Sequence, residues 1–310
     1  MKIAIAGSGA LGSGFGYQLY KNGEEVTLLD HWDEHIQAVN ENGLQITVNG
    51  DKDTIEIPMM EPKDLKDTMD LIFIFTKSMG LESMLEDIKH LIDENTKVVC
   101  LLNGLGHAQT LKKYLQPENV FMGTTMWTAG LDKPGVSHLQ GDGPVELQNM
   151  ALDGKEAAEN IVALLKEAGL NGEYSENVDY TTWRKASVNG TMNALSALLD
   201  ANLTEIFEVK QIQSILKSII EEFSLAAKLE DQVDLDVDEM VHYLTKGIGA
   251  NVGSHYPSMH QDISNRRPTE IDFLNGAVVK ILEEHEKEAK YCKAITDLIH
   301  AKEDVLGIER

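Results

Sequence analysis

"KIAIAGSGALGSGFG", residues 2–16, sets a glycine-rich turn between a short apolar run and the start of a helical pattern. A second apolar run, "EEVTLLD" (24–30), follows shortly afterwards. Two buried strands joined by a helix over so short a stretch predict a strand–helix–strand unit with parallel strands. The N-terminus therefore begins like a doubly wound α/β sheet.

Two more apolar runs extend this sheet, "DLIFIFTK" (70–77) and "KVVCLLNG" (97–104). Strands that are apolar on both faces are typical of a parallel sheet with helices on each side. We also expect a hairpin turning at Asn49-Gly50, a β-rich segment from 119 to 148, and a helix at 154–170 that closes the domain.

The character of the chain changes after residue 177. In "IQSILKSIIEEF" (212–223) the apolar residues recur at i, i+3 and i+4, the pattern of an amphipathic helix, and later segments continue in the same manner. The sequence therefore predicts an α/β Rossmann-type N-terminal domain over residues 1–177, followed by an all-α C-terminal domain over residues 178–310.

The composition excludes several classes of partner. A net charge of -24 argues against nucleic acid and against an anionic membrane surface, since both attract clustered Lys and Arg. The N-terminal stretch superficially resembles a signal peptide, but glycines interrupt its apolar region, and no run approaches the ~20 apolar residues of a membrane span. With only Cys100 and Cys292 present, we expect no disulfide framework, no metal site and a cytoplasmic protein.

The glycine-rich turn has the context of a dinucleotide site. Its glycines permit a tight turn and the close approach of a pyrophosphate, whose charge meets the free amides at the start of the helix. A glycine-rich turn that binds nothing is the alternative. The candidate residues are Gly7, Ser8, Gly9, Ala10, Leu11 and Gly12.

Asp30 ends the second apolar run, 18 residues after Gly12. A carboxylate there can accept hydrogen bonds from an adenosine ribose and repels a 2′-phosphate. No Lys or Arg occurs between Asp30 and Lys52, so the sequence favours NAD(H) over NADP(H), unless a cation from a distant segment folds over the site. As an alternative, Asp30 is a helix N-cap or a solvated turn residue.

A stripe of polar residues marks the helical pattern "WRKASVNGTMNALSALL" (183–199). Lys185, Asn189 and Asn193 fall at i, i+4 and i+8, on one face of a helix. A lysine can donate a proton to a carbonyl oxygen that becomes an alkoxide, and its charge stabilises that oxygen. The alternative for the stripe is a solvated helix face.

A second candidate stretch, "SMHQDISNRRPTEIDFLNG", contains Ser258 and Glu270. The alternative for Glu270 is an exposed carboxylate at a helix start.

The chain resembles the ketopantoate reductase family from end to end. The resemblance implies a Rossmann domain and an all-helical second domain. It rests on six segments that occur in order: "GSGALG" (7–12), "TK" (76–77), "NGLG" (103–106), "GTT" (123–125), "WRKASVN" (183–189) and "SMHQDI…RRPTEIDFLNG" (258–276).

The resemblance also assigns roles. It implies that Lys185 is the general acid for a ketone and that Glu270 orients the substrate and holds the lysine network. By the same resemblance Asn103 lies at the end of a sheet strand near nicotinamide and substrate, and Lys77 lies close to the cofactor. The remaining substrate contacts that it implies are Asn189, Asn193 and Ser258.

Two departures from the family pattern bear on specificity. Asp30 stands where the family usually has the cation that goes with NADPH. His255 and Tyr256 replace a smaller polar segment, and Trp127 lies in a loop region that could face the site. These changes suggest a different branched or aromatic 2-oxo acid, as in the NAD-dependent D-mandelate dehydrogenases that resemble the same family. The alternative is that Trp127 and Tyr256 are packing residues.

The predicted function is that of an NAD(P)-dependent oxidoreductase. It transfers hydride from the nicotinamide to C2 of a branched 2-oxo acid and gives an (R)-2-hydroxy acid. The family resemblance implies that this reaction is the reduction of ketopantoate to pantoate. One alternative is a D-2-hydroxyacid dehydrogenase of the D-mandelate type, and another is a non-catalytic NAD(H)-sensing regulator. Exposed apolar positions on the C-terminal helices leave a homodimer open.

Overall fold

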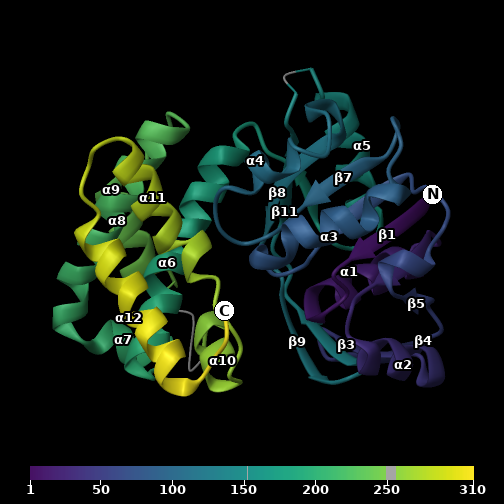
Figure 1. The fold of residues 1–310 in the computed structure, drawn as a ribbon, viewed down its shortest axis with the longest axis horizontal. Coiled ribbons are helices and arrows are strands. Elements are labelled where there is room, and N and C mark those ends of the chain that lie inside the picture. Colours follow the sequence, from purple (N-terminus) through teal and green to yellow (C-terminus); the bar gives the residue numbers. More distant parts are fainter. Residues whose placement is uncertain (152, 249–255) are drawn as a thin grey trace. The chain divides into compact units, whose positions relative to one another are not determined.

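The computed structural model describes residues 1–151, 153–248 and 256–310. His255 therefore lies outside the described residues. The chain forms two compact units (Figure 1). The first comprises Met1–Leu102 and His107–Val178, and the second comprises Asn103–Gly106 and Asp179–Arg310. The short segment 103–106, which the sequence analysis counts with the N-terminal domain, thus clusters with the C-terminal helices.

The first unit is built on a mixed sheet with the strand order β12-β11-β8-β7-β6-β1-β2-β5 in the described chain. Five neighbouring pairs, from β8 through β5, are parallel, as the apolar runs predict. The strands are β1 (Lys2–Ala6), β2 (Glu25–Leu29), β5 (Met59–Met60), β6 (Leu71–Ile74), β7 (Lys97–Cys100), β8 (Val120–Thr125), β11 (Val145–Asn149) and β12 (Gly172–Tyr174).

Helices cover both faces of this sheet because successive strand residues point to opposite faces. Ile3 and Ile5 of β1 share one core with Phe15 of α1, whereas Ala4 and Ala6 share another core with α3. The helices of this unit are α1 (Ala10–Lys21), α2 (Asp33–Asn42), α3 (Leu81–Ile88), α4 (His107–Leu111) and α5 (Lys155–Glu167), with short 3₁₀ turns η1 (Pro62–Asp64), η2 (Ser78–Gly80), η3 (Lys89–Leu91) and η4 (Pro117–Asn119).

A smaller sheet has the order β4-β3-β10-β9. The predicted hairpin is confirmed: β3 (Leu44–Val48) and β4 (Asp51–Ile55) are antiparallel, and Asn49 and Gly50 both have positive φ, as a tight two-residue turn requires. The β-rich segment supplies β9 (Thr128–Lys133) and β10 (Val136–Gln140). The antiparallel pairing of β11 with β8 and the short strand β12 were not predicted from the apolar runs.

Trp127 lies between β8 and β9 and is only 7% exposed. Its ring belongs to the same hydrophobic core as Phe15 and Leu139. This burial favours the alternative that Trp127 is a packing residue. The reason is that a large aromatic side chain at the junction of two sheets is most stable with its apolar surface removed from water.

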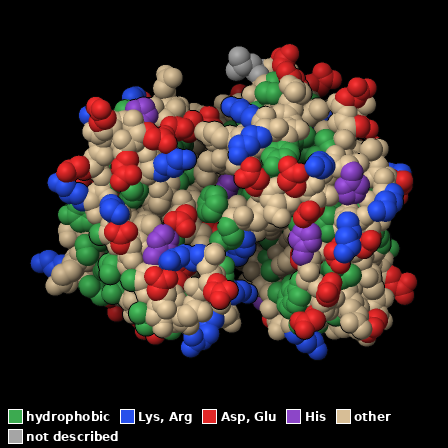
Figure 2. Space-filling view, in the orientation of Figure 1, with side chains coloured by type: hydrophobic (Ala, Val, Ile, Leu, Met, Phe, Trp, Pro, Cys, Tyr) green, Lys and Arg blue, Asp and Glu red, His purple; other side chains and the backbone are tan. Residues whose placement is uncertain are grey.

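The second unit is helical throughout its described residues, as predicted. Figure 2 shows acidic and basic side chains interspersed over the visible face of the protein. In the described part of the chain no helix has the length and apolar character that a membrane span needs. The elements are α6 (Val178–Leu199), α7 (Leu203–Glu208), α8 (Lys210–Glu230), α9 (Val237–His242), a π-helical turn η5 (Tyr243–Ile248), α10 (Ser258–Ser264), η6 (Ile271–Phe273), α11 (Asn275–Glu284) and α12 (Lys290–Leu306).

Helix α6 is buried along much of its length because it carries small residues where other helices approach. A Cβ atom added at Gly190 would lie 2.4 Å from Cζ of Phe223 on α8 and 3.0 Å from Oδ1 of Asn275 on α11. Both partners are fully buried, so neither can move aside without disturbing the core. Gly190 therefore sets how closely α8 approaches the helix that carries the polar stripe.

We predict that Gly190→Ala lowers the free energy of unfolding by about 1–3 kcal/mol, because overpacking outweighs the gain of roughly 1 kcal/mol in helix propensity. Chemical denaturation, followed by a spectroscopic signal from the second unit, measures this free energy of unfolding. Gly80→Ala is the matched control, since the nearest atom to its added Cβ is 3.7 Å away. Equal stability of Gly190→Ala and wild type would contradict the packing argument.

Candidate active site

The glycine-rich turn between β1 and α1 has three glycines with different environments. Gly7 has φ +91°, and a Cβ there would lie 2.5 Å from the Thr76 backbone nitrogen. A Cβ at Gly12 would lie 2.2 Å from the Gly7 carbonyl oxygen. Gly9 differs, since nothing lies within 4 Å of an added Cβ. The backbone therefore packs too closely at Gly7 and Gly12 for a side chain, whereas the space at Gly9 is open.

This open space lies at the start of α1, whose first amides have no carbonyl partner within the helix. Ala10, Leu11 and Gly12 occupy these first positions. A pyrophosphate fits there, because it needs close backbone approach and amide donors. The residues at this turn of the first unit thus suit a dinucleotide.

Ser8 shapes the turn through its side chain. Its hydroxyl donates to the Ile5 carbonyl at 2.9 Å and accepts from the Leu29 amide at 3.0 Å, which ties β1 to β2. The Ser8 amide also donates to the Leu29 carbonyl. The hydroxyl and the amide of Ser8 therefore both hold the fold together, and Ser8 stabilises the turn that forms the candidate site.

His35 was missed by sequence reasoning, although it holds the turn from the opposite side. The Gly135 amide donates to His35 Nδ1 at 2.8 Å, and His35 Nε2 lies 3.0 Å from the Ser8 carbonyl oxygen. Since Nδ1 accepts a hydrogen bond, the proton is on Nε2 and is donated to Ser8. Burial lowers the pKa of His35, which keeps the ring neutral. Only tertiary contacts give this histidine its role.

Asp30 follows β2 directly. Its Oδ1 accepts hydrogen bonds from the amides of His31 at 2.8 Å and Trp32 at 3.1 Å. This turn is the alternative considered for Asp30, but it uses one carboxylate oxygen and is compatible with a ribose contact at the other.

Two basic side chains belong to the same neighbourhood, and both have acidic partners. His31 Nε2 lies 3.1 Å from Asp87 Oδ2. Lys63 lies far from Asp30 in sequence, but the negative charge of Asp33 acts on it. Its Nζ is 2.7 Å from Glu61 Oε2. The end of β2 therefore remains acidic.

Lys77 directly follows Thr76, a residue that packs against the glycine-rich turn. Thr76 packs against Gly7, and Lys77 follows it as the exposed N-cap residue of η2. The resemblance-based placement of Lys77 near the cofactor agrees with this position in the first unit.

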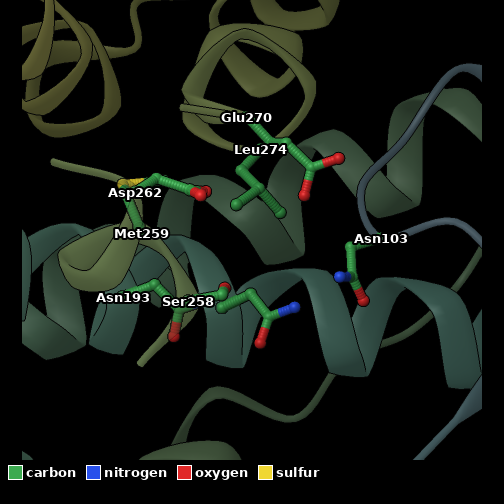
Figure 3. A pocket seen from close by; sticks show the side chains of 8 residues that line it. Asn103, Asn193, Ser258, Met259, Asp262, Glu270 and Leu274 are labelled. Carbon is green, nitrogen blue, oxygen red and sulfur yellow. The ribbon is translucent and has the colours of Figure 1, made fainter. Parts of the chain in front are cut away.

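A pocket in the second unit brings together most of the remaining candidates. Its empty volume is about 230 Å³, which includes space open to solvent. In Figure 3, Asn193 and Ser258 lie on one side of this space and Glu270 and Leu274 on the other. The lining residues are Asn103, Asn189, Asn193, Ser258, Met259, Asp262, Glu270 and Leu274.

The polar stripe on α6 and the start of α10 meet at this pocket. Asn193 Nδ2 donates to Ser258 Oγ at 3.4 Å, across 65 residues of sequence. Asn189 lies one turn before Asn193 and lines the same pocket, so the stripe faces a site and not only water.

Sequence reasoning missed three lining residues, Met259, Asp262 and Leu274. Asp262 is one turn after Ser258 on α10, and this i, i+4 spacing was a usable signal. Its carboxylate is buried and accepts a hydrogen bond from Arg267 Nε at 3.1 Å. Met259 and Leu274 are buried and supply apolar surface. Tyr256 is not among the lining residues in the described chain; it is 39% exposed and packs on the His260 ring.

Asn103 reaches this pocket because its segment is tied to η6. The Leu105 amide donates to the Phe273 carbonyl at 2.8 Å. Gly104 has φ +99°, and a Cβ there would lie 2.6 Å from the same carbonyl oxygen. The two contacts place Asn103 beside the segment that carries Glu270.

Glu270 is positioned by a buried carboxylate behind it. The Thr269 amide donates to Glu303 Oε1 at 2.8 Å, and Glu303 is fully buried. Arg310 compensates its charge with NH1 3.4 Å from Glu303 Oε2. A buried charge is tolerated only when paired in this way. The chain's last residue thus helps to set the backbone beside Glu270.

Lys185 belongs to the polar stripe but is not among the residues that line the pocket. Burial lowers the pKa of Lys185 to about 8, and the negative charge of Glu270 opposes that shift. The sequence left open which effect is larger; here burial is. A lysine with a pKa near neutrality exchanges its proton readily with a substrate.

Comparisons with known proteins agree with this arrangement. A family model described as "Ketopantoate reductase PanE/ApbA" matches residues 3–151, and one described as "Ketopantoate reductase PanE/ApbA C terminal" matches residues 177–303. The chain is 47% identical over 310 residues to a 2-dehydropantoate 2-reductase of Lactococcus lactis subsp. lactis, with 99% of each chain covered. It is also 47% identical over 311 residues to a 2-dehydropantoate 2-reductase of Streptococcus pyogenes serotype M1, with 100% of each covered.

Solved structures include an equally extensive match. The ternary structure of a D-mandelate dehydrogenase with NADH and anilino(oxo)acetate superposes with a TM-score of 0.96 at 43% sequence identity, covering 100% of both chains. Both units of the chain are thus covered by these matches. The chain belongs to the ketopantoate reductase family.

Proposed function

We propose that this protein is a nicotinamide-dependent 2-oxo acid reductase whose substrate is 2-dehydropantoate, which it reduces to an (R)-2-hydroxy acid. The observation that carries the proposal is the pocket that gathers Asn103, Asn189, Asn193, Ser258 and Glu270 near a lysine whose pKa burial lowers to about 8. The 47% identity to 2-dehydropantoate 2-reductases over the whole chain supports the substrate.

In the proposed reaction each residue has one task. The bound nicotinamide cofactor supplies hydride to C2 of the substrate. The Lys185 ammonium donates a proton to the carbonyl oxygen as negative charge develops there. Glu270 favours the charged form of Lys185 and orients the substrate.

Substrate recognition follows from the chemistry of the pocket. Asn and Ser side chains are neutral donors, so Asn189, Asn193 and Ser258 can hold a carboxylate without neutralising it. Met259 and Leu274 offer apolar contact to a branched alkyl group. A small, branched and polar acid suits this set better than a flat aromatic one.

For the cofactor we propose NAD(H). Asp30 repels a 2′-phosphate, and two basic groups, His31 and Lys63, form ion pairs with Asp87 and Glu61. The NADH in the structure of the similar D-mandelate dehydrogenase supports this choice.

Two other functions compete with the proposal. A D-2-hydroxyacid dehydrogenase of the D-mandelate type is favoured by the TM-score of 0.96 to such an enzyme. A non-catalytic NAD(H)-sensing regulator is disfavoured because the pocket retains Asn103, Asn189, Asn193, Ser258 and Glu270, polar residues that a sensor has no need to keep.

The test of function is steady-state NADH oxidation with ketopantoate, benzoylformate and other branched 2-oxo acids. We expect kcat/KM for ketopantoate to exceed that for benzoylformate at least tenfold, a discrimination of about 1.4 kcal/mol. The reverse order identifies the mandelate type, and no turnover with any acid identifies the sensor.

We predict that Lys185→Ala lowers kcat by about 10²–10⁴-fold with NADH binding unchanged, because only the proton donor is removed. Lys217→Ala, an exposed lysine paired with Asp238, is the control. Unchanged turnover in Lys185→Ala would remove it from the mechanism.

The pH dependence has a defined sign. Reduction requires protonated Lys185, so its rate should be constant below about pH 8 and fall above it, while oxidation of the hydroxy acid should rise through the same range. Kinetics in both directions over this range measure it. Residual activity of Lys185→Arg should lack the inflection, since arginine stays protonated.

We expect Asp30→Asn to lower the NADH-to-NADPH ratio of kcat/KM at least about tenfold. The amide oxygen can still accept the His31 and Trp32 amides, so the turn survives while the charge is lost. Asp33→Asn is the charge-matched control. A wild-type enzyme that prefers NADPH would sink this assignment.

A further inference from the structure

Trp32 is an exposed aromatic side chain just beyond β2, two residues after Asp30. It is 41% exposed, whereas Trp127 and Trp183 are 7% and 2% exposed. An indole ring left in water forgoes the free energy of burying a large apolar surface. A single exposed apolar side chain is common on protein surfaces, so its orientation and its neighbours decide whether it has a role.

The Trp32 ring is held in one orientation. It stacks on the His35 ring, with the ring centroids 5.5 Å apart and an interplanar angle of 30°. The indole Nε1 donates to Glu34 Oε2 at 2.9 Å, and the Trp32 amide donates to Asp30 Oδ1 at 3.1 Å. His35 is fully buried, so the exposed surface of the indole is the part that His35 does not cover. The ring is thus preorganised with apolar surface open to a ligand.

The same contacts place Trp32 beside the glycine-rich turn. His35 Nε2 lies 3.0 Å from the Ser8 carbonyl oxygen. The Ser8 amide in turn donates at 3.0 Å to the carbonyl of Leu29, the residue before Asp30. The indole, the carboxylate and the turn therefore lie together at the carboxyl ends of β1 and β2, where parallel sheets bind ligands, and all three belong to the first unit.

We propose that Trp32 binds the adenine ring of the cofactor by stacking against the exposed surface of its indole. The inference rests on the proposed NAD(H) function, in which Asp30 accepts hydrogen bonds from the adenosine ribose. The base is joined to that ribose, so it lies near the residues that follow Asp30. Asp33 and Glu34 come directly after Trp32 and repel a phosphate, which leaves a neutral group as the ligand here. Stacking of a base on an aromatic side chain requires only a flat ring face.

Isothermal titration calorimetry with ADP-ribose tests the proposal without turnover, since this ligand carries adenosine and pyrophosphate but no nicotinamide. We expect Trp32→Leu to raise the Kd at least about tenfold and Trp32→Phe to keep it within about threefold, because leucine still covers His35 but has no aromatic face. Tyr291→Leu is the matched control, since Tyr291 is 44% exposed on α12. Equal Kd values for wild type and Trp32→Leu, or equal losses in Trp32→Leu and Trp32→Phe, overturn the proposal.

Steady-state kinetics separate this inference from the function on which it rests. We expect Trp32→Leu to raise the KM for NADH at least about tenfold and to keep kcat at saturating NADH within about twofold, as for lost ground-state binding. A lower kcat with an unchanged KM overturns the inference. If the wild type binds no ADP-ribose, the proposed cofactor and this inference fail together. If ADP-ribose binds with the expected pattern but no 2-oxo acid is reduced, the proposed reductase fails and the role of Trp32 stands.

Discussion

The proposed chemistry depends above all on the balance between the burial of Lys185 and the charge of Glu270. Burial alone disfavours the ammonium, and a nearby carboxylate favours it. The two effects together lower the pKa of Lys185 to about 8. Stronger burial would leave a neutral amine at neutral pH, and weaker burial a poor proton donor. The fold around Lys185 therefore has to hold Glu270 in place.

Four separate segments meet this requirement in the second unit. Helix α6 supplies the asparagines, α10 supplies Ser258 and Asp262, the turn before η6 supplies Glu270, and the loop after β7 supplies Asn103. Each segment is held by a specific contact, such as the Leu105 amide on the Phe273 carbonyl and the Thr269 amide on Glu303. Backbone hydrogen bonds, ion pairs to the buried carboxylates of Asp262 and Glu303, and the Asn193–Ser258 hydrogen bond thus help to preorganise the pocket.

The first unit solves a different problem with glycine. Gly7 and Gly12 allow the turn to pack tightly against Thr76 and against itself, and Gly9 leaves space for a ligand. His35 and Ser8 fix this turn from the protein side by hydrogen bonds that use their polar atoms fully. The cofactor choice proposed above rests on the carboxylate of Asp30 after β2.

From the sequence alone we predicted the strand–helix–strand start, the hairpin at Asn49-Gly50, the helical second half and the polar stripe on α6, because these depend on local periodicity and on short segments characteristic of the family. Only the tertiary structure decided that Trp127 belongs to the core, that β11 runs antiparallel, that Asp262 and Leu274 line the pocket, and that segment 103–106 joins the helical unit. It also decided that burial outweighs the charge of Glu270 in setting the pKa of Lys185. These features arise from contacts between residues far apart in the chain, which local pattern does not encode.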